Sequence, residues 1–338
     1  MSTSTYPSPA VPAVASTRAG LVVRLSVTSR CQLRCTYCLP EKGCACPSEP
    51  TRELSTAELV RLVGLLHDSH GVRRVRFTGG EPLLRNDLPE LIGAVADLGI
   101  PELALTTNAQ LLAPRVASLR RAGVQRINIS LDSLRPEVFD RLSRGGVLAR
   151  TLDGIRAALS AGFAPVKLNT VVLRGHNDTE VGDLLRFALQ TGCHLRFLEL
   201  MPIGVAADDF EQRFVSAAEI RERLNDEGLE WDELPWDPSE TSRDWLVRDR
   251  AGRETTCGFI APTTQPFCAE CRRLRLTSEG RLHGCLARPS EFDLTSLLTS
   301  ADDGTARRAL ENVLAAAFAQ KRGERFTDGI ATMASVGG

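Results

Sequence analysis

The amino-acid sequence predicts an α/β fold: an incomplete (β/α)6 barrel of the TIM type, followed by a C-terminal α+β extension. Three observations predict it. Short strand patterns alternate six times with helical patterns, which implies a parallel sheet with right-handed crossovers. The strands alternate apolar with polar residues, whereas parallel strands covered on both faces are almost continuously apolar. No GxGxxG follows the first strand, which argues against a dinucleotide-binding Rossmann domain.

The elements are expected in one continuous series after an N-terminal tail. Residues 1–18 are rich in Ser, Thr, Pro and Ala and predict a flexible tail; a core over 19–205 and a C-terminal region over 206–338 follow. Most helical patterns begin at a capping Ser, Thr or Asp or end at Gly. The predicted strands are 21–27, 72–78, 102–108, 126–132, 165–172 and 194–200, and the predicted helices are 55–69, 87–99, 113–123, 150–162 and 179–192.

One face of the predicted sheet carries polar side chains. In the first strand, Arg24 and Ser26 alternate with Val23 and Leu25, and the later strands repeat this pattern. Residues two apart in a strand share a face. Because a closed barrel fills its interior with apolar layers, the polar face predicts an open barrel around a wet or ligand-filled cavity. A sheet with one solvated face is the alternative.

Composition and charge narrow the class of protein. The 338 residues are 43% hydrophobic and 25% charged, which excludes disorder along the whole length. Forty-one basic against 42 acidic residues leave no bulk charge for binding nucleic acid or membranes, so any anion recognition must be local. No apolar run approaches membrane-spanning length, and the N-terminus has no secretory-signal pattern, so we expect a cytoplasmic protein.

Six of the ten cysteines fall into two groups of three. A structural zinc ion takes four protein ligands, and neither group supplies a fourth at short spacing, although His283 could complete the second. Three thiolates on a 4Fe–4S cluster leave one iron open for a substrate or cofactor. Two such clusters are predicted, with zinc or one pooled site as alternatives. The groups are Cys31, Cys35 and Cys38, and Cys268, Cys271 and Cys285.

The other four cysteines have no predicted ligand role. Cys193 and Cys257 have apolar neighbours and are expected to pack as small buried hydrophobes. Cys44 and Cys46 lie in a loop containing Gly and Pro, for which we expect a surface position, with an extra redox function as the alternative.

Two motifs at the ends of the first two strands resemble those of the radical S-adenosylmethionine (SAM) enzymes. CQLRCTYC has their CxxxCxxC spacing, and TGGEPLLR at 78–85 resembles their GGE motif. The resemblance implies that the amino and carboxylate groups of SAM chelate the open iron. Gly79 and Gly80 would let the backbone approach the methionyl group, and Glu81 could accept a hydrogen bond from its ammonium.

Segments along nearly the whole chain resemble one family within that superfamily, the GTP 3′,8-cyclases. The most specific is CxxCx13C at 268–285, with a chain end of Gly337 and Gly338. The resemblance implies GTP ligands at Arg24, Arg74, Arg76, Thr78, Lys167, Arg196, Arg273 and Arg275. It implies SAM contacts at Tyr37, Gly79, Gly80, Glu81, Thr106, Ser130 and Met201, with help from Thr78. Catalytic roles would fall to Arg24, Arg273, Arg275, Gly337 and Gly338.

The residues also favour an anionic ligand without the resemblance. Inward-facing Arg74, Arg76 and Lys167 would be costly to bury, because few acidic residues share their strand faces. A triphosphate supplies the missing charge. We expect Arg273 and Arg275 to add cations from the opposite side of the cavity, and guanidinium groups suit phosphate well.

The resemblance implies a reaction and partners. A reduced first cluster would cleave SAM to a 5′-deoxyadenosyl radical, which would take hydrogen from C3′ of GTP so that C3′ attacks C8; the second cluster would bind guanine. The product, 3′,8-cyclo-7,8-dihydro-GTP, begins molybdenum cofactor synthesis. A flavodoxin- or ferredoxin-type electron donor, a downstream cyclic pyranopterin monophosphate synthase and a homodimer are expected, and the Gly-Gly tail is expected to reach the site.

Alternatives come from different classes. Departures from the family pattern at Leu39, Arg74, Ala109 and Ala331 leave open a diverged paralogue acting on another nucleotide. A peptide-modifying radical enzyme, an iron–sulfur carrier and a zinc-stabilised binding module are further alternatives. GGEP on the second strand favours an enzyme, because a carrier does not need it.

Overall fold

The computed structural model describes residues 20–40, 52–225, 228–237, 240–268, 271–288, 291–300 and 302–321. The predicted tail over 1–18, the loop cysteines Cys44 and Cys46, and the terminal Gly337 and Gly338 lie outside the described residues.

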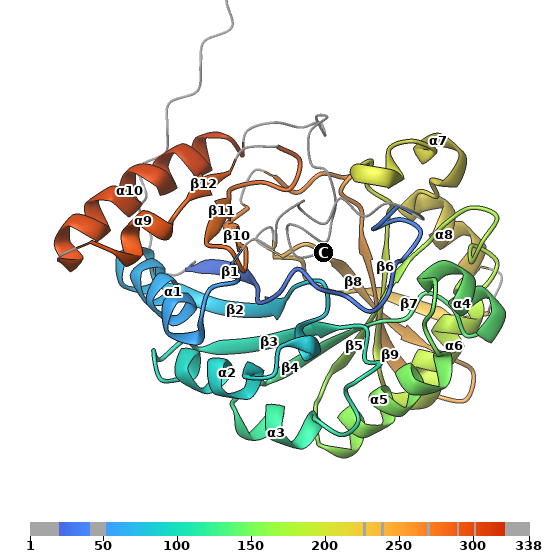
Figure 1. Ribbon diagram of the computed structural model, residues 1–338. Helices are drawn as coiled ribbons and strands as arrows, with labels where there is room; N and C mark the ends of the chain where they lie inside the picture. The colour runs from blue at the N-terminus through green and yellow to red at the C-terminus, as the bar shows by residue number, and fades with distance from the viewer. Residues whose placement is uncertain are drawn as a thin grey trace, which may run out of the picture.

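A single curved sheet organises the described residues (Figure 1). Its strand order is β12-β11-β10-β1-β2-β3-β4-β5-β6-β9-β8-β7. From β10 to β9 in this order each strand runs parallel to its neighbour, and the outer strands pair antiparallel. The strands are β1 (Leu21–Ser26), β2 (Val72–Thr78), β3 (Glu102–Thr107), β4 (Arg126–Ser130), β5 (Val166–Val171), β6 (His194–Leu198), β7 (Glu230–Glu233), β8 (Arg243–Arg248), β9 (Glu254–Ile260), β10 (Arg273–Leu276), β11 (Arg281–His283) and β12 (Phe292–Asp293).

Helices cover the outer face of the curved sheet, as Figure 1 shows for the helices labelled α1, α2, α3, α5 and α6. The sequence begins α1 with a capping box, in which Ser55 accepts from the Glu58 backbone and Glu58 accepts from the Ser55 backbone. The helices are α1 (Thr56–His70), α2 (Leu88–Ala96), α3 (Val116–Arg121), α4 (Pro136–Ser143), α5 (Leu148–Ser160), α6 (Val181–Thr191), α7 (Phe210–Arg213), α8 (Ala217–Leu224), α9 (Thr295–Leu298) and α10 (Asp303–Ala319), with 3-10 turns η1 (Pro82–Leu84) and η2 (Gly204–Ala206).

The two faces of the sheet differ as the alternation predicts. Leu25 and Phe77 are fully buried in the apolar core, whereas Arg24 and Arg76, their neighbours in sequence, are only partly buried. The same alternation in β5 buries Leu168 and leaves Lys167 partly exposed. The helices therefore pack on an apolar outer face, and the polar inner face lines the cavity.

The predicted fold class is confirmed, and the six predicted strands match β1 to β6 within two residues at each end. Helix α4 is an element that the prediction left out, although Pro136 and Glu137 at its start are a helix-initiation signal. Cys193 and Cys257 are fully buried in the core, as expected. None of the described helices is both long and apolar enough to cross a membrane.

One expectation about the C-terminal region is wrong. Arg273 and Arg275 do not enter from the opposite side of the cavity, because β10 pairs in parallel with β1 and places Arg275 directly beside Arg24. Strand β9 extends the other edge beside β6 in the same way. The C-terminal region therefore continues both walls of the open barrel within one sheet.

Candidate active site

The first cysteine group lies in the loop after β1, at the carboxyl ends of the parallel strands. The backbone N–H of Cys38 donates to the carbonyl oxygen of Cys35 over 2.8 Å. Burial, then Asp132, then the thiols of Cys38 and Cys31 raise the pKa of Cys35 well above its usual range. The three thiols therefore lie close enough to influence one another, and bound iron would stabilise their ionised forms.

The surroundings of this group fit an iron–sulfur cluster. Cys31 Sγ accepts from the Leu33 backbone at 3.4 Å and from Asn108 Nδ2 at 3.9 Å, and hydrogen bonds to ligand sulfurs tune such clusters. Three thiolates are the protein ligands that a 4Fe–4S cluster with one open iron needs, so the donor set fits such a cluster.

The second cysteine group lies at the amino end of β10, opposite the carboxyl ends that bear the first group. Cys271 comes just before β10, and Cys285 follows β11, which runs back along β10. Arg275 and Lys321 each interact electrostatically with both of these thiols, and the Cys271 backbone donates to Cys268 O over 3.2 Å. The two groups thus lie at opposite ends of the neighbouring strands β1 and β10.

A buried lysine lies against the second group. Lys321, 7% exposed, donates from Nζ to Cys271 O at 3.1 Å, to Cys271 Sγ at 3.7 Å and to Arg273 O. Burial alone would raise the pKa of Cys271, but the positive charges of Arg273 and Lys321 lower it. This environment favours a thiolate, the form that binds iron.

The glycines of the GGE segment are required by close backbone packing. A Cβ on Gly80 would lie 2.3 Å from Arg30 O, and a Cβ on Gly79 would lie 2.5 Å from Thr28 O. The Gly80 backbone N–H also donates to Thr28 O at 2.8 Å. An added Cβ at either glycine would face the segment that leads to Cys31, so the glycines fix the loop of the first cysteine group. The expected approach of a methionyl group to their backbone stays a proposal.

Glu81 is held by donors from its own segment and from the end of β3. Its Oε1 accepts from the Leu83 backbone at 3.1 Å and from the Thr107 hydroxyl at 2.6 Å, and its Oε2 accepts from the Asn108 backbone at 2.8 Å. Burial raises its pKa to about 7 despite these bonds. Glu81 therefore ties β2 to β3 beside the cysteine loop, and its contact with SAM stays a proposal.

Tyr37 joins the cysteine loop to the end of β4. Its hydroxyl donates to Asp132 Oδ2 over 2.6 Å, and Asp132 Oδ1 accepts from the Val171 backbone over 2.9 Å. The tyrosine side chain thus braces the loop on two strands. The other predicted SAM contacts lie at the same end of the sheet: Thr106 in β3, Ser130 at the end of β4 and Met201 after β6.

A cavity of about 230 Å³ lies on the polar face of the sheet. Four predicted GTP ligands line it: Arg74, Arg76, Lys167 and Arg196. Arg24 lies opposite Arg76 in the β1–β2 register and opposite Arg275 in the β1–β10 register. The lining residues are Arg74, Arg76, Ala104, Arg126, Asn128, Lys167, Arg196, Glu240, Ser242 and Asp244.

The cations of this region repel one another. Burial and then Arg275 and Arg273 lower the pKa of Arg24 well below its usual range. Burial and then Arg196 lower the pKa of Lys167 to about 8. Among the described residues, Arg76 Nε and Arg273 Nη1 are buried donors without a hydrogen-bond partner. A bound polyanion would satisfy these donors and relieve the repulsion.

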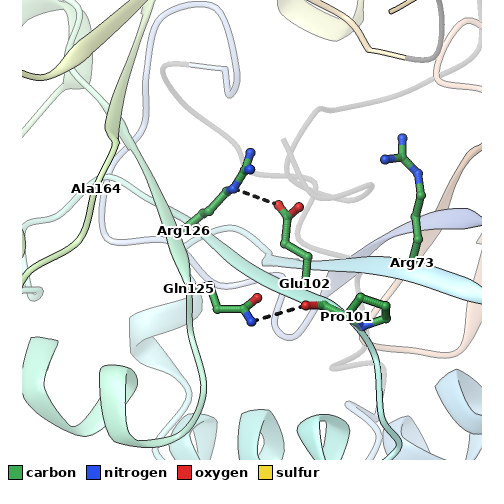
Figure 2. Close-up of a pocket in the computed structure, with 6 residues that line it drawn as sticks. All are labelled: Arg73, Pro101, Glu102, Gln125, Arg126 and Ala164. Atoms are coloured by element: carbon green, nitrogen blue, oxygen red, sulfur yellow. Dashed lines mark hydrogen bonds and ion pairs between the residues drawn. The ribbon is translucent and has the colours of Figure 1, made fainter.

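A second, more open pocket of about 480 Å³ lies at the amino ends of the strands (Figure 2). Figure 2 shows Arg126 and Glu102 pointing toward one another, and their ion pair measures 3.3 Å. Arg126 lines this outer pocket and also the inner cavity. Although the outer pocket is larger, the predicted ligands gather in the inner cavity. The outer pocket thus shares Arg126 with the cavity and lies at the end away from the first cysteine group.

Several site residues were missed by the sequence analysis. Arg126 precedes Asn128 by two residues, so the alternation already indicated that it faces the cavity. Asn108 directly follows β3 and Asp132 comes two residues after β4, but neither was given a role in the site. Lys321 and Glu240 come from the C-terminal region, whose folding onto the barrel no local pattern revealed.

Comparisons with known proteins agree with this geometry. Residues 25–188 match the family model "Radical SAM superfamily", and residues 193–326 match "Molybdenum Cofactor Synthesis C". The chain is 44% identical to a GTP 3′,8-cyclase of Paenarthrobacter nicotinovorans, covering 85% of this chain and 83% of that protein. It is 43% identical to a GTP 3′,8-cyclase of Heliobacterium modesticaldum (strain ATCC 51547 / Ice1), covering 88% of each.

A solved structure supports the fold alone. Streptococcus suis SuiB bound to S-adenosylmethionine superposes with a TM-score of 0.60 at 15% identity, covering 92% of this chain and 67% of that one. These matches and the cysteine loop beside the GGE segment define the chain as a radical SAM enzyme. Within that class, it belongs to the GTP 3′,8-cyclase family. This membership argues against the carrier and zinc-module alternatives.

Gly80→Ala should reduce iron binding at the first cysteine group at least tenfold, because the added Cβ meets backbone atoms of the segment leading to Cys31. Iron analysis and SAM binding of anaerobically reconstituted protein measure the effect. Gly93→Ala in α2 is the matched control, since its Cβ would meet nothing within 4 Å. Normal iron content at the first group in Gly80→Ala would contradict this account.

Lys321→Met should make the second cluster harder to reduce, because a buried cation beside the ligand thiolates stabilises an added electron. A redox titration monitored by electron paramagnetic resonance measures the potential. Lys321→Arg keeps the charge and is the control. Equal potentials in the wild type and Lys321→Met would show that the lysine only packs against α10.

Proposed function

We propose that this chain converts GTP to 3′,8-cyclo-7,8-dihydroguanosine 5′-triphosphate by radical SAM chemistry, the first step of molybdenum cofactor synthesis. One observation carries the proposal: a cation-lined cavity lies on β2 to β6, next to β1 and β10, whose opposite ends bear the two three-cysteine groups. A ligand in this cavity would be held at both of its ends, one near each cysteine group. The curated relatives are named for this reaction.

The first cysteine group is proposed to hold a 4Fe–4S cluster with SAM on its open iron. When bound and reduced, the cluster supplies the electron that cleaves SAM to methionine and a 5′-deoxyadenosyl radical. The described residues shape that end of the site: Glu81 fixes the GGE segment, and Tyr37 braces the loop on Asp132. Thr106, Ser130 and Met201 are proposed to seat SAM.

The second cysteine group is proposed to hold the auxiliary 4Fe–4S cluster that binds guanine. Arg24, Arg273 and Arg275 lie on β1 and β10 between the two groups, where they would hold the nucleotide and balance its charge. Arg74, Arg76, Lys167 and Arg196 would bind the phosphates. Thr78, at the end of β2, lies between the predicted SAM and GTP contacts.

The protein's task in this reaction is positional. The cavity must hold C3′ of GTP against the radical carbon, because orientation supplies much of the rate that a bound radical needs. The cations must also bind the substrate in one register along the strands. Water and stray hydrogen donors are excluded once the ligand fills the cavity.

The proposal extends to partners and location. A flavodoxin- or ferredoxin-type protein would donate the electron, and a cyclic pyranopterin monophosphate synthase would consume the product. We also propose a cytoplasmic protein and a homodimer.

The decisive experiment is anaerobic incubation of the reduced, cluster-loaded protein with SAM and GTP. We expect 5′-deoxyadenosine formation that depends on GTP, with deuterium transferred from C3′-labelled GTP. Formation of 5′-deoxyadenosine that does not depend on GTP, or hydrogen transfer from another position of GTP, would overturn the assignment. Cys35→Ala should abolish SAM cleavage in the same assay.

Arg76→Ala should weaken GTP binding about 10- to 100-fold, because it removes a charged donor to the phosphates. Iron content and SAM binding should be unchanged. Equilibrium binding of GTP to cluster-loaded protein measures the effect. Arg248→Ala is the control, since this half-exposed arginine pairs with Glu254 away from the cavity. Wild-type affinity in Arg76→Ala would remove that residue from the phosphate site.

The terminal Gly337 and Gly338 are proposed to reach into the active site, since residues without side chains can thread a narrow gap. Deleting both should abolish cyclisation while both clusters still assemble. Iron analysis and product detection separate the two effects. Full cyclase activity after the deletion is the contrary result.

A further inference from the structure

An acidic side chain lies among the cations of the cavity. Glu240 Oε1 lies 3.0 Å from Arg74 Nη1 and 3.6 Å from Arg73 Nη2. Its Oε2 lies 3.4 Å from Arg74 Nη1. Burial alone would raise the pKa of Glu240, but Arg74 and Arg73 lower it. Glu240 is therefore a carboxylate that occupies a binding position of an arginine predicted to hold phosphate.

Arg74 lies at the far end of the cation array from the first cysteine group. It precedes Arg76 by two residues in β2, which places it nearer the amino ends of the strands by about 7 Å. It also pairs with Glu102, its register partner on β3, over 2.7 Å. Glu102 in turn lines the outer pocket of Figure 2. Arg74 thus lines the cavity on the side of the outer pocket, at the end of the cation array farthest from the first cysteine group.

The three carboxylates near this end of the cavity differ in how they are held. Glu102 belongs to β3, and Asp244 belongs to β8 and accepts from the Ser242 hydroxyl. Glu240 lies outside both strands, in the connection between β7 and β8, and its backbone N–H donates only locally, to Asp237 O at 2.9 Å. Its side chain is 37% exposed. Glu240 can therefore leave Arg74 without breaking a strand pair.

The cavity around Glu240 carries an excess of positive charge, which favours a bound anion. The cavity lining carries five cationic and two acidic side chains, so the pocket keeps an excess of positive charge. Glu240 offsets part of this excess at Arg74, whereas Arg76 retains a buried Nε without a partner among the described residues. A triphosphate brings more charge than one carboxylate and can displace it.

We propose that Glu240 competes with the terminal phosphate of the substrate for Arg74. Glu240 pairs with Arg74 in the empty site, is displaced when the triphosphate binds, and pairs with Arg74 again when the product leaves. This inference rests on the proposed function, because that function makes the ligand a nucleoside triphosphate. Glu240 then lowers the affinity for the triphosphate end and leaves nucleotides too short to reach Arg74 unaffected.

The test is equilibrium binding of GTP and GMP to cluster-loaded Glu240→Gln. Glutamine keeps the size of the side chain and one acceptor oxygen, and it removes the charge. GTP should bind about tenfold more tightly than to the wild type, the size of one lost charge contact. GMP should change less than about twofold, because it does not reach Arg74. Glu254→Gln, in an exposed pair with Arg248, is the matched control for a lost surface charge.

Two outcomes would overturn the proposal. Weaker or unchanged GTP binding in Glu240→Gln would mean that the carboxylate orients Arg74 for the ligand instead of competing with it. An equal gain in affinity for GTP and GMP would mean that the lost charge affects every bound nucleotide and does not act at the terminal phosphate.

Inorganic tripolyphosphate separates this inference from the proposed function, because it needs the cations but no guanine recognition. Tighter tripolyphosphate binding in Glu240→Gln, without GTP-dependent cleavage of SAM, would uphold the role of Glu240 and overturn the proposed function. GTP-dependent cleavage with unchanged tripolyphosphate and GTP affinities would uphold the function and overturn the role of Glu240.

Discussion

The mutual repulsion of the cations on the inner face of the sheet is the constraint on which the site depends. Arg24, Arg76 and Arg275 lie side by side on three neighbouring strands, where burial and like charges both oppose their ionised forms. The apolar outer face of the same strands is packed under helices, which holds the backbone of this row in place. This row of cations therefore favours the binding of an extended anion.

The sheet also separates two kinds of chemistry. At its carboxyl edge, the thiol loop after β1 is tied down by glycines that allow direct backbone contact, by Glu81 and by the Tyr37–Asp132 bond. At the amino end of β10, Lys321 and Arg273 make a cationic setting for the second thiol group. Buried carboxylates lie near the thiols of the first group, whereas cations lie near those of the second. The two groups of three cysteines therefore have opposite electrostatic surroundings.

Much of this arrangement could be predicted from local patterns. Period-two alternation in β1, β2 and β5 revealed which side chains share the inner face, because a strand fixes that geometry within a few residues. The spacing of the cysteines marked both groups. What could not be predicted arises from contacts distant in sequence: the pairing of β10 beside β1, the bond from Lys321 to Cys271, and the approach of Glu240 to Arg74. The contacts of the two glycines with Thr28 and Arg30 could not be predicted either, since only the folded chain brings those residues against them.

The parallel pairing of β10 with β1 has a consequence for substrate choice. Cys271 comes just before β10 and Cys31 comes after β1, so the length of these strands acts as a spacer between the thiol groups. Each residue in an extended strand adds about 3.3 Å to that spacer. If one substrate is anchored at both groups, as proposed, it must match a length set by the backbone as well as a pattern of charge. Relatives that lengthened or shortened β1 would present a different atom of the same ligand to the reactive end, without changing any residue that touches it.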